Sequence, residues 1–134
     1  MRTRRVEVLR EHATLVALHT LTFPGDEQPE WNPDGVAWIT YDGADPVAFL
    51  YAEPMLDESW YFSRVGVMPA ARGQRLQRKL MRLMQLRLSD KVLVSTTYRN
   101  PASANNFVRE QWMTYLPAAP WGSPDTIYWR LDPC

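Results

Sequence analysis

Apolar residues alternate with polar ones, or run together, in short segments separated by polar turns. Such segments predict β-strands at residues 6–9, 36–41, 46–52, 60–67, 92–97 and 126–131. The second to fourth segments follow one another through short polar connections, and Asp42-Gly43-Ala44-Asp45 has the composition of a hairpin turn. We therefore expect an antiparallel meander in the middle of the chain.

Residues 11–21 carry apolar side chains at the spacing of an amphipathic helix, which Pro24-Gly25 would end. His12 and His19 lie seven positions apart, on one side of this predicted helix. Metal ligation would need a closer spacing and further ligands. We therefore interpret both histidines as surface or boundary residues and expect no bound metal.

A longer helix is predicted over residues 72–88. Its apolar face would be buried and consists of Leu76, Leu80, Leu83, Met84 and Leu88. Another face is basic, with Arg75, Lys79 and Arg82. The helix stands between two predicted strands, and this order implies a right-handed crossover that pairs the two strands in parallel.

Composition narrows the class of protein. The 134 residues are 46% hydrophobic and 22% charged, which fits one globular domain spanning residues 1–134. The formal net charge of zero argues against a nucleic-acid-binding surface. Cys134 is the only cysteine, so no intrachain disulfide can form. Because no apolar run approaches the ~20 residues that span a bilayer, we expect a cytoplasmic protein with no membrane partner.

The turn between the strand at 60–67 and the long helix has the features of an anion site. Pro69 opens it, Arg72-Gly73 follows, and the helix then begins with N–H groups that have no partner inside the helix. The helix dipole adds positive potential at this end, so that backbone alone can hold a pyrophosphate. Arg75 and Arg78 add side-chain charge nearby.

This stretch resembles the acetyl-CoA-binding motif of the GNAT N-acetyltransferase superfamily, Val-x-Pro-x-x-Arg-Gly-x-Gly-x-Gly followed by an apolar helix. The residues that match it as they stand are Val67, Pro69, Arg72 and Gly73. Arg75 and Gln77 stand where the family usually has glycine.

A second stretch also resembles a signature of that family. Asn100 opens a predicted short helix with Pro101 at its first position, and Trp112 stands in for the family's aromatic residue. Gln111 replaces the usual glycine before it. The resemblance implies an α/β fold with a mixed, mostly antiparallel sheet of six to seven strands and about three helices packed on both faces. It also implies that the two parallel strands splay apart and admit the pantetheine arm.

The resemblance further implies roles for individual residues. The pyrophosphate of acetyl-CoA would be held by Arg72, Gly73, Gln74, Arg75, Leu76 and Gln77. Val65 and Val67 would contact the acyl-pantetheine through their backbone, and the Val65 N–H would stabilise the developing oxyanion. Asn100 and Phe107 would contact the arm further along.

Candidates for the acid and base are less distinct. Many relatives have a tyrosine where Phe107 stands, and phenylalanine cannot donate a proton. Tyr98 is our candidate acid and Tyr115 its alternative, unless the thiolate leaves unassisted. The carboxylates that could accept the proton of the amine are Glu53, our candidate, and also Glu30 and Asp125.

The acidic loop at residues 23–35 would meet the acceptor in such a fold. Glu30 could attract a cationic amine and Trp31 could pack on it, and Trp121 is a further candidate contact. The alternative is a solvated connection. The two tryptophans also leave room for a homodimer.

Together these observations predict an N-acetyltransferase that moves an acetyl group from acetyl-CoA, its co-substrate, to a primary amine of a small molecule or peptide. The alternative is a catalytically silent GNAT-fold domain that binds a protein partner or CoA without turnover. The sequence lacks the Gly-x-Ser-x-Gly elbow of serine hydrolases and the Gly-Lys-Ser/Thr of a P-loop, which argues against those two classes.

Overall fold

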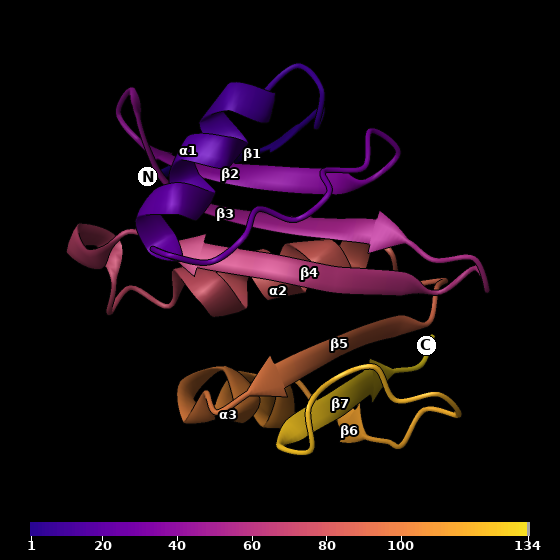
Figure 1. Ribbon diagram of the computed structural model, residues 1–134. Helices are drawn as coiled ribbons and strands as arrows, with labels where there is room; N and C mark the ends of the chain where they lie inside the picture. Colours follow the sequence, from indigo (N-terminus) through magenta and orange to yellow (C-terminus); the bar gives the residue numbers. More distant parts are fainter. Residues whose placement is uncertain (134) are drawn as a thin grey trace.

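The computed structural model describes residues 1–133, and within them seven strands form one sheet (Figure 1). The strands are β1 (Arg2–Val6), β2 (Val36–Asp42), β3 (Asp45–Pro54), β4 (Trp60–Val67), β5 (Leu93–Tyr98), β6 (Met113–Thr114) and β7 (Thr126–Leu131). The helices are α1 (His12–Thr22), α2 (Leu76–Arg87) and α3 (Pro101–Arg109), and a 3-10 turn (Pro69–Ala71) precedes α2.

The sheet has the order β1-β2-β3-β4-β5-β7-β6, in which β4 and β5 are parallel and the other neighbours antiparallel. The predicted meander is therefore confirmed as β2, β3 and β4. The predicted crossover is confirmed as well, because α2 connects the parallel strands β4 and β5. The mixed, mostly antiparallel α/β architecture is the one expected.

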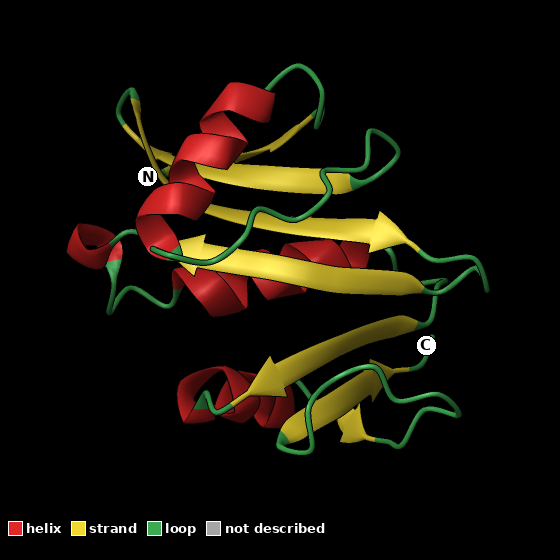
Figure 2. Ribbon diagram, viewed as in Figure 1, coloured by secondary structure: helices red, strands yellow, loops and turns green. Residues whose placement is uncertain are grey.

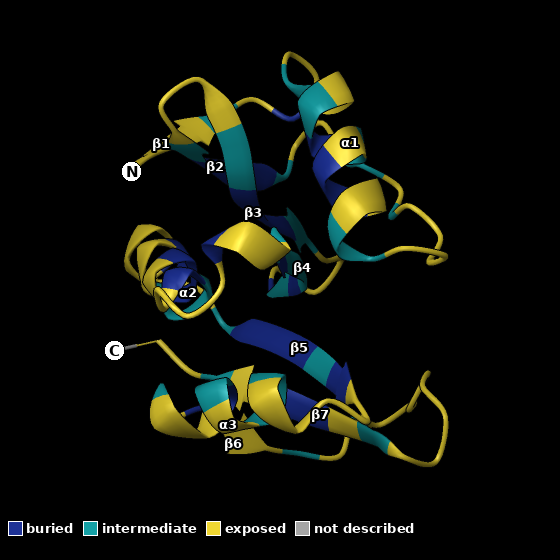
Figure 3. Cartoon of the chain, turned by 90° about the vertical axis from the view of Figure 1, so that its left-hand side faces the viewer, coloured by how far each residue is buried: buried dark blue, intermediate teal, exposed yellow. Residues whose placement is uncertain are grey.

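Helices cover both faces of the sheet (Figure 2). On one face α1 packs mainly on β3 and β4, and its Leu15 and Leu18 join a core with Phe49. On the other face α2 and α3 share a larger core, in which Met84 and Phe107 lie. Figure 3 shows that the outward sides of the helices are exposed while most of β5 is buried.

The strands β4 and β5 separate soon after they begin, and this places the candidate site. Only Trp60↔Leu93 and Tyr61↔Val94 are paired between them. Beyond these pairs the two ribbons diverge toward their carboxyl ends (Figure 1). On its other side β4 stays paired with β3 throughout, with a register shift between Tyr51 and Ala52. The opening therefore lies within the sheet, between two strands that run in the same direction.

Some expected boundaries were wrong. The first strand lies at Arg2–Val6, not at residues 6–9, because it is an edge strand held by its backbone ladder to β2 and not by an alternating apolar face. The two-residue strand β6 carries too little pattern to be predicted. Leu83, expected in the core, is 38% exposed because it lies at the margin of the buried stripe of α2. No helix within residues 1–133 combines the length and the apolar character needed to cross a membrane.

Candidate functional site

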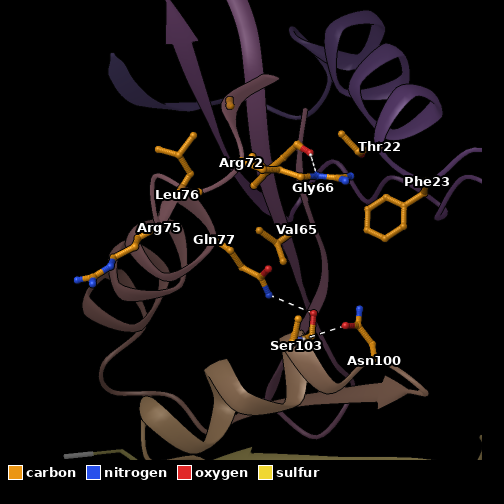
Figure 4. Close-up of a pocket in the computed structure, with 14 residues that line it drawn as sticks. Thr22, Phe23, Val65, Gly66, Arg72, Arg75, Leu76, Gln77, Asn100 and Ser103 are labelled. Carbon is orange, nitrogen blue, oxygen red and sulfur yellow. Dashed lines mark hydrogen bonds between the residues drawn. The ribbon is translucent and has the colours of Figure 1, made fainter. Parts of the chain in front are cut away.

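A cavity of about 490 Å³ lies where α2 begins, between this helix, β4 and the start of α3 (Figure 4). Eight residues predicted to contact acetyl-CoA line it: Val65, Val67, Arg72, Gly73, Arg75, Leu76, Gln77 and Asn100. Gln74 is the one member of the 72–77 stretch that does not. The structure thus brings together residues that are up to 35 positions apart in the sequence.

The backbone before α2 has the shape expected of a turn that can bind an anion. Arg72 is extended and its Nε donates to the carbonyl of Val67 at 3.3 Å, while Gly73 has a φ of +85°. Arg75, the residue before the helix, has a φ of +58° and makes no side-chain cap within the described residues. The N–H groups of the first turn are therefore left for an anion.

Four non-glycine residues within 1–133 have the positive φ that glycine favours, and two of them, Arg75 and Gln111, stand where the resembled motifs have glycine. Arg75 does so before α2, and its side chain extends outward from the start of that helix (Figure 4). Gln111 has a φ of +66° at the end of α3, where the N–H of Trp112 donates to the carbonyl of Phe107 at 2.9 Å. This is the left-handed ending that normally selects glycine. At these two positions the residue differs from glycine while the backbone has a conformation that favours glycine.

A second cavity of about 250 Å³ continues from the first into the gap between β4 and β5. The residues that line both cavities are Phe23, Val65, Gln77, Asn100 and Ser103. Tyr98 and Phe107 line only the second. Together the cavities form a cleft that starts at α2 and passes through the splay toward the face covered by α1. We call this the central cleft.

The N–H of Val65 is directed into the central cleft. The N–H of Met68 donates to Val47 on β3, so by the alternation of a strand Gly66 also faces β3. The backbone N–H and C=O groups of Val65 and Val67 therefore point away from β3 and toward the cleft. The hydrogen bond from Arg72 to the Val67 carbonyl shows this direction independently.

Ser103 was not anticipated and links α2 to α3 across the cleft. The Nε2 of Gln77 donates to its Oγ at 3.2 Å (Figure 4). The N–H of Ser103 donates to Oδ1 of Asn100 at 3.1 Å, which makes Asn100 the N-cap of α3. The Asn-x-x-Ser spacing marks the cap in the sequence. The contact with Gln77 depends on how the two helices dock.

Phe107 belongs mainly to the core. It is 3% exposed, stacks on Trp129 with ring centroids 5.3 Å apart and meets Trp112 edge-on at 4.8 Å. Only part of its surface lines the central cleft. Its packing explains why an apolar ring suits this position.

The candidate acids are separated by the fold. Tyr98 is 51% exposed and lines the second cavity. Tyr115 lies elsewhere, near the amino ends of β4 and β5, in a pocket that Trp121 also lines. Burial raises the pKa of Tyr115. Trp121 approaches the central cleft only indirectly, since its ring meets that of Tyr61 with centroids 6.5 Å apart.

The candidate carboxylates do not line the central cleft. Glu53 accepts a hydrogen bond of 2.7 Å from the hydroxyl of Tyr51, whose pKa is raised chiefly by burial. Asp125 pairs with Arg99 at 2.6 Å. Glu30 is exposed, and its carbonyl lies 3.4 Å from the Tyr51 hydroxyl.

Trp31 is partly buried and packs against the core on the α1 side of the sheet. Its ring packs on that of Tyr51 with centroids 4.7 Å apart, and its Nε1 donates to Gln28 at 3.1 Å. Neither Trp31 nor Glu30 lines either cavity of the cleft. The loop folds back on the sheet because Trp31 finds an aromatic cluster there.

His19 corrects the expectation of a surface or boundary histidine, since it is fully buried. It stacks on Phe23 with ring centroids 5.0 Å apart, and its Nε2 accepts from Nε of Arg64 at 3.3 Å. Burial, and next the charge of Arg64, lower the pKa of His19, while Asp26 acts weakly in the opposite direction. His19 follows Leu15 by four positions and so continues the buried stripe of α1, a signal present in the sequence.

Neither a family model nor a curated protein matches the sequence. Solved structures do match along nearly the whole chain. An acetyltransferase of Thermus thermophilus is 18% identical with a TM-score of 0.73, covering 98% of this chain and 97% of its own. A GNAT-family protein of Desulfovibrio desulfuricans is 16% identical with a TM-score of 0.73, covering 98% of each chain.

The chain has the GNAT fold. A further structure with this fold is diaminobutyrate acetyltransferase of Paenibacillus lautus in complex with L-2,4-diaminobutyric acid and coenzyme A, which is 15% identical with a TM-score of 0.72. The match covers 98% of this chain and 94% of that one. The GNAT fold accounts for the parallel pair β4 and β5 at the centre of the sheet and for the helix α2 that connects them.

Proposed function

We propose that this protein is an N-acetyltransferase that transfers an acetyl group from acetyl-CoA to a primary amine. One observation carries the proposal: the central cleft begins at the free amides of α2 and continues into the gap between β4 and β5. A charged pyrophosphate suits the first part and a narrow acyl arm suits the second. Solved structures of the same fold include an acetyltransferase bound to coenzyme A and an amino-acid substrate.

Each part of the cleft has a role in this proposal. Arg72 and the amides that follow Arg75 hold the pyrophosphate through charge and backbone N–H groups. Gln77 and Asn100 contact the arm where it passes between α2 and α3. Because these groups belong to rigid elements, they position the thioester beside Val65 before the acceptor arrives.

Transfer needs little from side chains once both substrates are held. The amine nitrogen attacks the thioester carbonyl carbon, the C–S bond breaks, and the amine loses a proton to water. The Val65 N–H, directed into the cleft, donates to the oxygen on which charge develops. Tyr98, at the edge of the second cavity, protonates the departing thiolate.

A second function is favoured by one observation. Phe107, at the position of the usual acid, is a core residue without a hydroxyl group, and no Asp or Glu of residues 1–133 lines the central cleft. A GNAT-fold domain that binds CoA without turnover would need neither group. Release of free CoA thiol in the presence of amines separates the two functions, because only the enzyme produces it.

The cofactor assignment is tested by calorimetric titration with acetyl-CoA, with ATP as the control ligand. We expect micromolar binding by the wild type and none by Gly73→Pro. Proline fixes φ near about −65° and cannot adopt the +85° of Gly73, so the turn must rearrange.

The control is Gly43→Ala, which strains another positive φ, +62°, in the β2–β3 hairpin outside the cleft. It should bind like the wild type. Circular dichroism confirms that each variant is folded. Absence of binding to the wild type at millimolar acetyl-CoA contradicts the proposed function, and unchanged affinity in folded Gly73→Pro contradicts the role of the turn.

A further inference from the structure

The central cleft carries charge of one sign. The ionised side chains that line it are Arg64, Arg72 and Arg75, and no carboxylate of residues 1–133 joins them. Arg72 and Arg75 lie at the α2 end, where the proposed function uses positive charge for a pyrophosphate. Arg64 lies in the second cavity, away from that end. Its charge needs a different explanation.

Arg64 is oriented by neutral groups. Its Nε donates to His19 at 3.3 Å and its Nη1 to the carbonyl of Ser63 at 3.0 Å. The side chain is partly buried. It takes part in none of the ion pairs within residues 1–133, and no hydrogen bond from its Nη2 occurs there. A guanidinium has five N–H donors in a fixed fork, so most of this group remains available to a ligand.

His19 holds this orientation without neutralising the charge. It accepts a hydrogen bond at Nε2, which requires the neutral imidazole with its proton on Nδ1. Asp26 is close enough to affect His19 electrostatically, yet it forms no ion pair with Arg64. The guanidinium is therefore fixed in direction by an aromatic base and keeps its full charge toward the cleft.

The rest of the wall of this cavity is uncharged and combines apolar side chains with hydroxyl groups. The hydroxyl of Tyr61 lies 3.0 Å from Oγ1 of Thr96, and Tyr98 stands further along β5. These hydroxyls can accept from an ammonium or an amine, but they offer no countercharge. A polycation would meet the repulsion of Arg64 here with nothing to offset it. A ligand that carries both an amine and an anion would not.

We infer that the acceptor is an amine that also carries a carboxylate, of the α-amino acid class, with its carboxylate paired to the guanidinium of Arg64. The inference rests on the proposed function. Arg64 then binds the carboxylate of the acceptor in a bidentate ion pair while the amine reaches the thioester beside Val65. The pairing also supplies the charge that this partly buried guanidinium lacks in the chain itself.

This class of acceptor also suits a cleft without a carboxylate base. In a free amino acid the carboxylate favours the charged ammonium beside it and so raises the pKa of the amine. Pairing that carboxylate with Arg64 offsets this effect, and the pKa of the amine therefore falls on binding. The neutral amine attacks the carbonyl carbon, the C–S bond breaks, and the proton passes to water, so no further reactant is needed.

The test compares acceptors that share a side chain: free amino acids, their amides and their decarboxylated amines, with spermidine as a polycation. Thiol release gives kcat and KM for the wild type, Arg64→Gln and Arg64→Lys. We expect the acids to be preferred at least tenfold in kcat/KM and Arg64→Gln to lose about tenfold or more, mainly through KM, for acids only. Arg64→Lys should retain part of the preference.

Arg130→Gln is the matched control, because Arg130 is an exposed arginine paired with Asp132 at 2.8 Å and lines neither cavity of the cleft. It should behave like the wild type. The inference is overturned if amides or spermidine are acetylated as efficiently as the acids. It is also overturned if Arg64→Gln lowers kcat/KM equally for acids and amides. Failure of every acid while acetyl-CoA still binds overturns the acceptor class alone, whereas absent acetyl-CoA binding overturns the proposed function.

A second readout does not depend on acetyl-CoA. In isotope-labelled protein, the arginine Nε–H resonance that disappears in Arg64→Gln is assigned to Arg64. We expect it to shift on titration with an amino acid and to stay in place with the corresponding amide. No shift with either ligand contradicts the pairing.

Discussion

At the scale of single residues, the clearest feature is that Arg75 occupies a glycine conformation. A residue with a Cβ at a φ of +58° costs roughly 1 kcal/mol relative to its ordinary backbone regions. The turn before α2 has this shape nonetheless. Gly73 and Leu76, on either side of Arg75, line the same cavity as Arg75. The strain therefore lies within the proposed binding turn.

We predict that Arg75→Gly leaves the free energy of unfolding unchanged or raises it by up to about 1 kcal/mol. Glycine relieves the backbone strain, and its greater freedom in the unfolded chain offsets part of the gain. Lys79→Gly, inside α2 on its exposed face, should instead lose about 1 kcal/mol. Urea denaturation measures both, and equal losses would mean that Arg75 is not strained.

At the scale of elements, α2 and α3 are held together by an ion-pair group beside the central cleft. Glu110, whose side chain is 6% exposed, accepts from Arg78 at 3.0 Å and from Arg82 at 3.1 Å. Burial pushes the pKa of Glu110 up, but hydrogen bonds from the two guanidinium groups outweigh it and hold the pKa below its ordinary value. The carboxylate is therefore ionised at neutral pH and fixes the spacing of the two helices.

We predict that Glu110→Gln lowers the free energy of unfolding by about 2 kcal/mol at pH 7, because it leaves the partly buried Arg78 without its countercharge. Asp90→Asn is the control, since Asp90 meets Lys91 only at 3.9 Å and both are exposed. Its effect should stay within about 0.5 kcal/mol. Urea denaturation of both variants is the measurement, and losses of the same size would show that the Glu110 group does not hold the helices.

At the scale of the whole molecule, two groups with little solvent exposure, His19 and Glu110, make stability depend on pH in the same direction. The folded protein holds the pKa of His19 below its ordinary value of 6.5, so the unfolded chain binds more protons as the pH falls below that value. The pKa of Glu110 is also depressed, and its contribution is present above 4.5 and lost as pH falls through the folded value. Acid therefore destabilises this protein, through His19 first.

We predict that the wild type loses stability between pH 7.5 and pH 5 and that His19→Gln depends less on pH over this interval. His12→Gln, at an exposed position of the same helix, should keep the wild-type dependence. Urea denaturation at several pH values tests this. Equal slopes for the three proteins would exclude His19 as the titrating group.

The local pattern of apolar and polar residues was enough to predict most of the helices and strands. β4 and β7 have the predicted bounds, and α1, β2, β3, β5 and α3 lie within a few residues of them. These elements bury one face, and the period of their apolar residues reports that face directly. The turn at Gly73 was equally readable, because its positive φ selects a residue type. The residues expected to hold a pyrophosphate accordingly line one cavity, apart from Gln74.

By itself, then, the sequence determined the meander, the crossover through α2 and the turn at Gly73. The tertiary structure alone decided which side chains line the cleft between β4 and β5. It packed Trp31 against the core, left Glu53 outside the cavities and set His19 against Arg64, 45 positions away. The physical reason is that periodicity reports which face of an element is buried. Which side chains meet across elements depends on strand register, on the splay of β4 from β5 and on helix docking, and these arise only when the whole core packs.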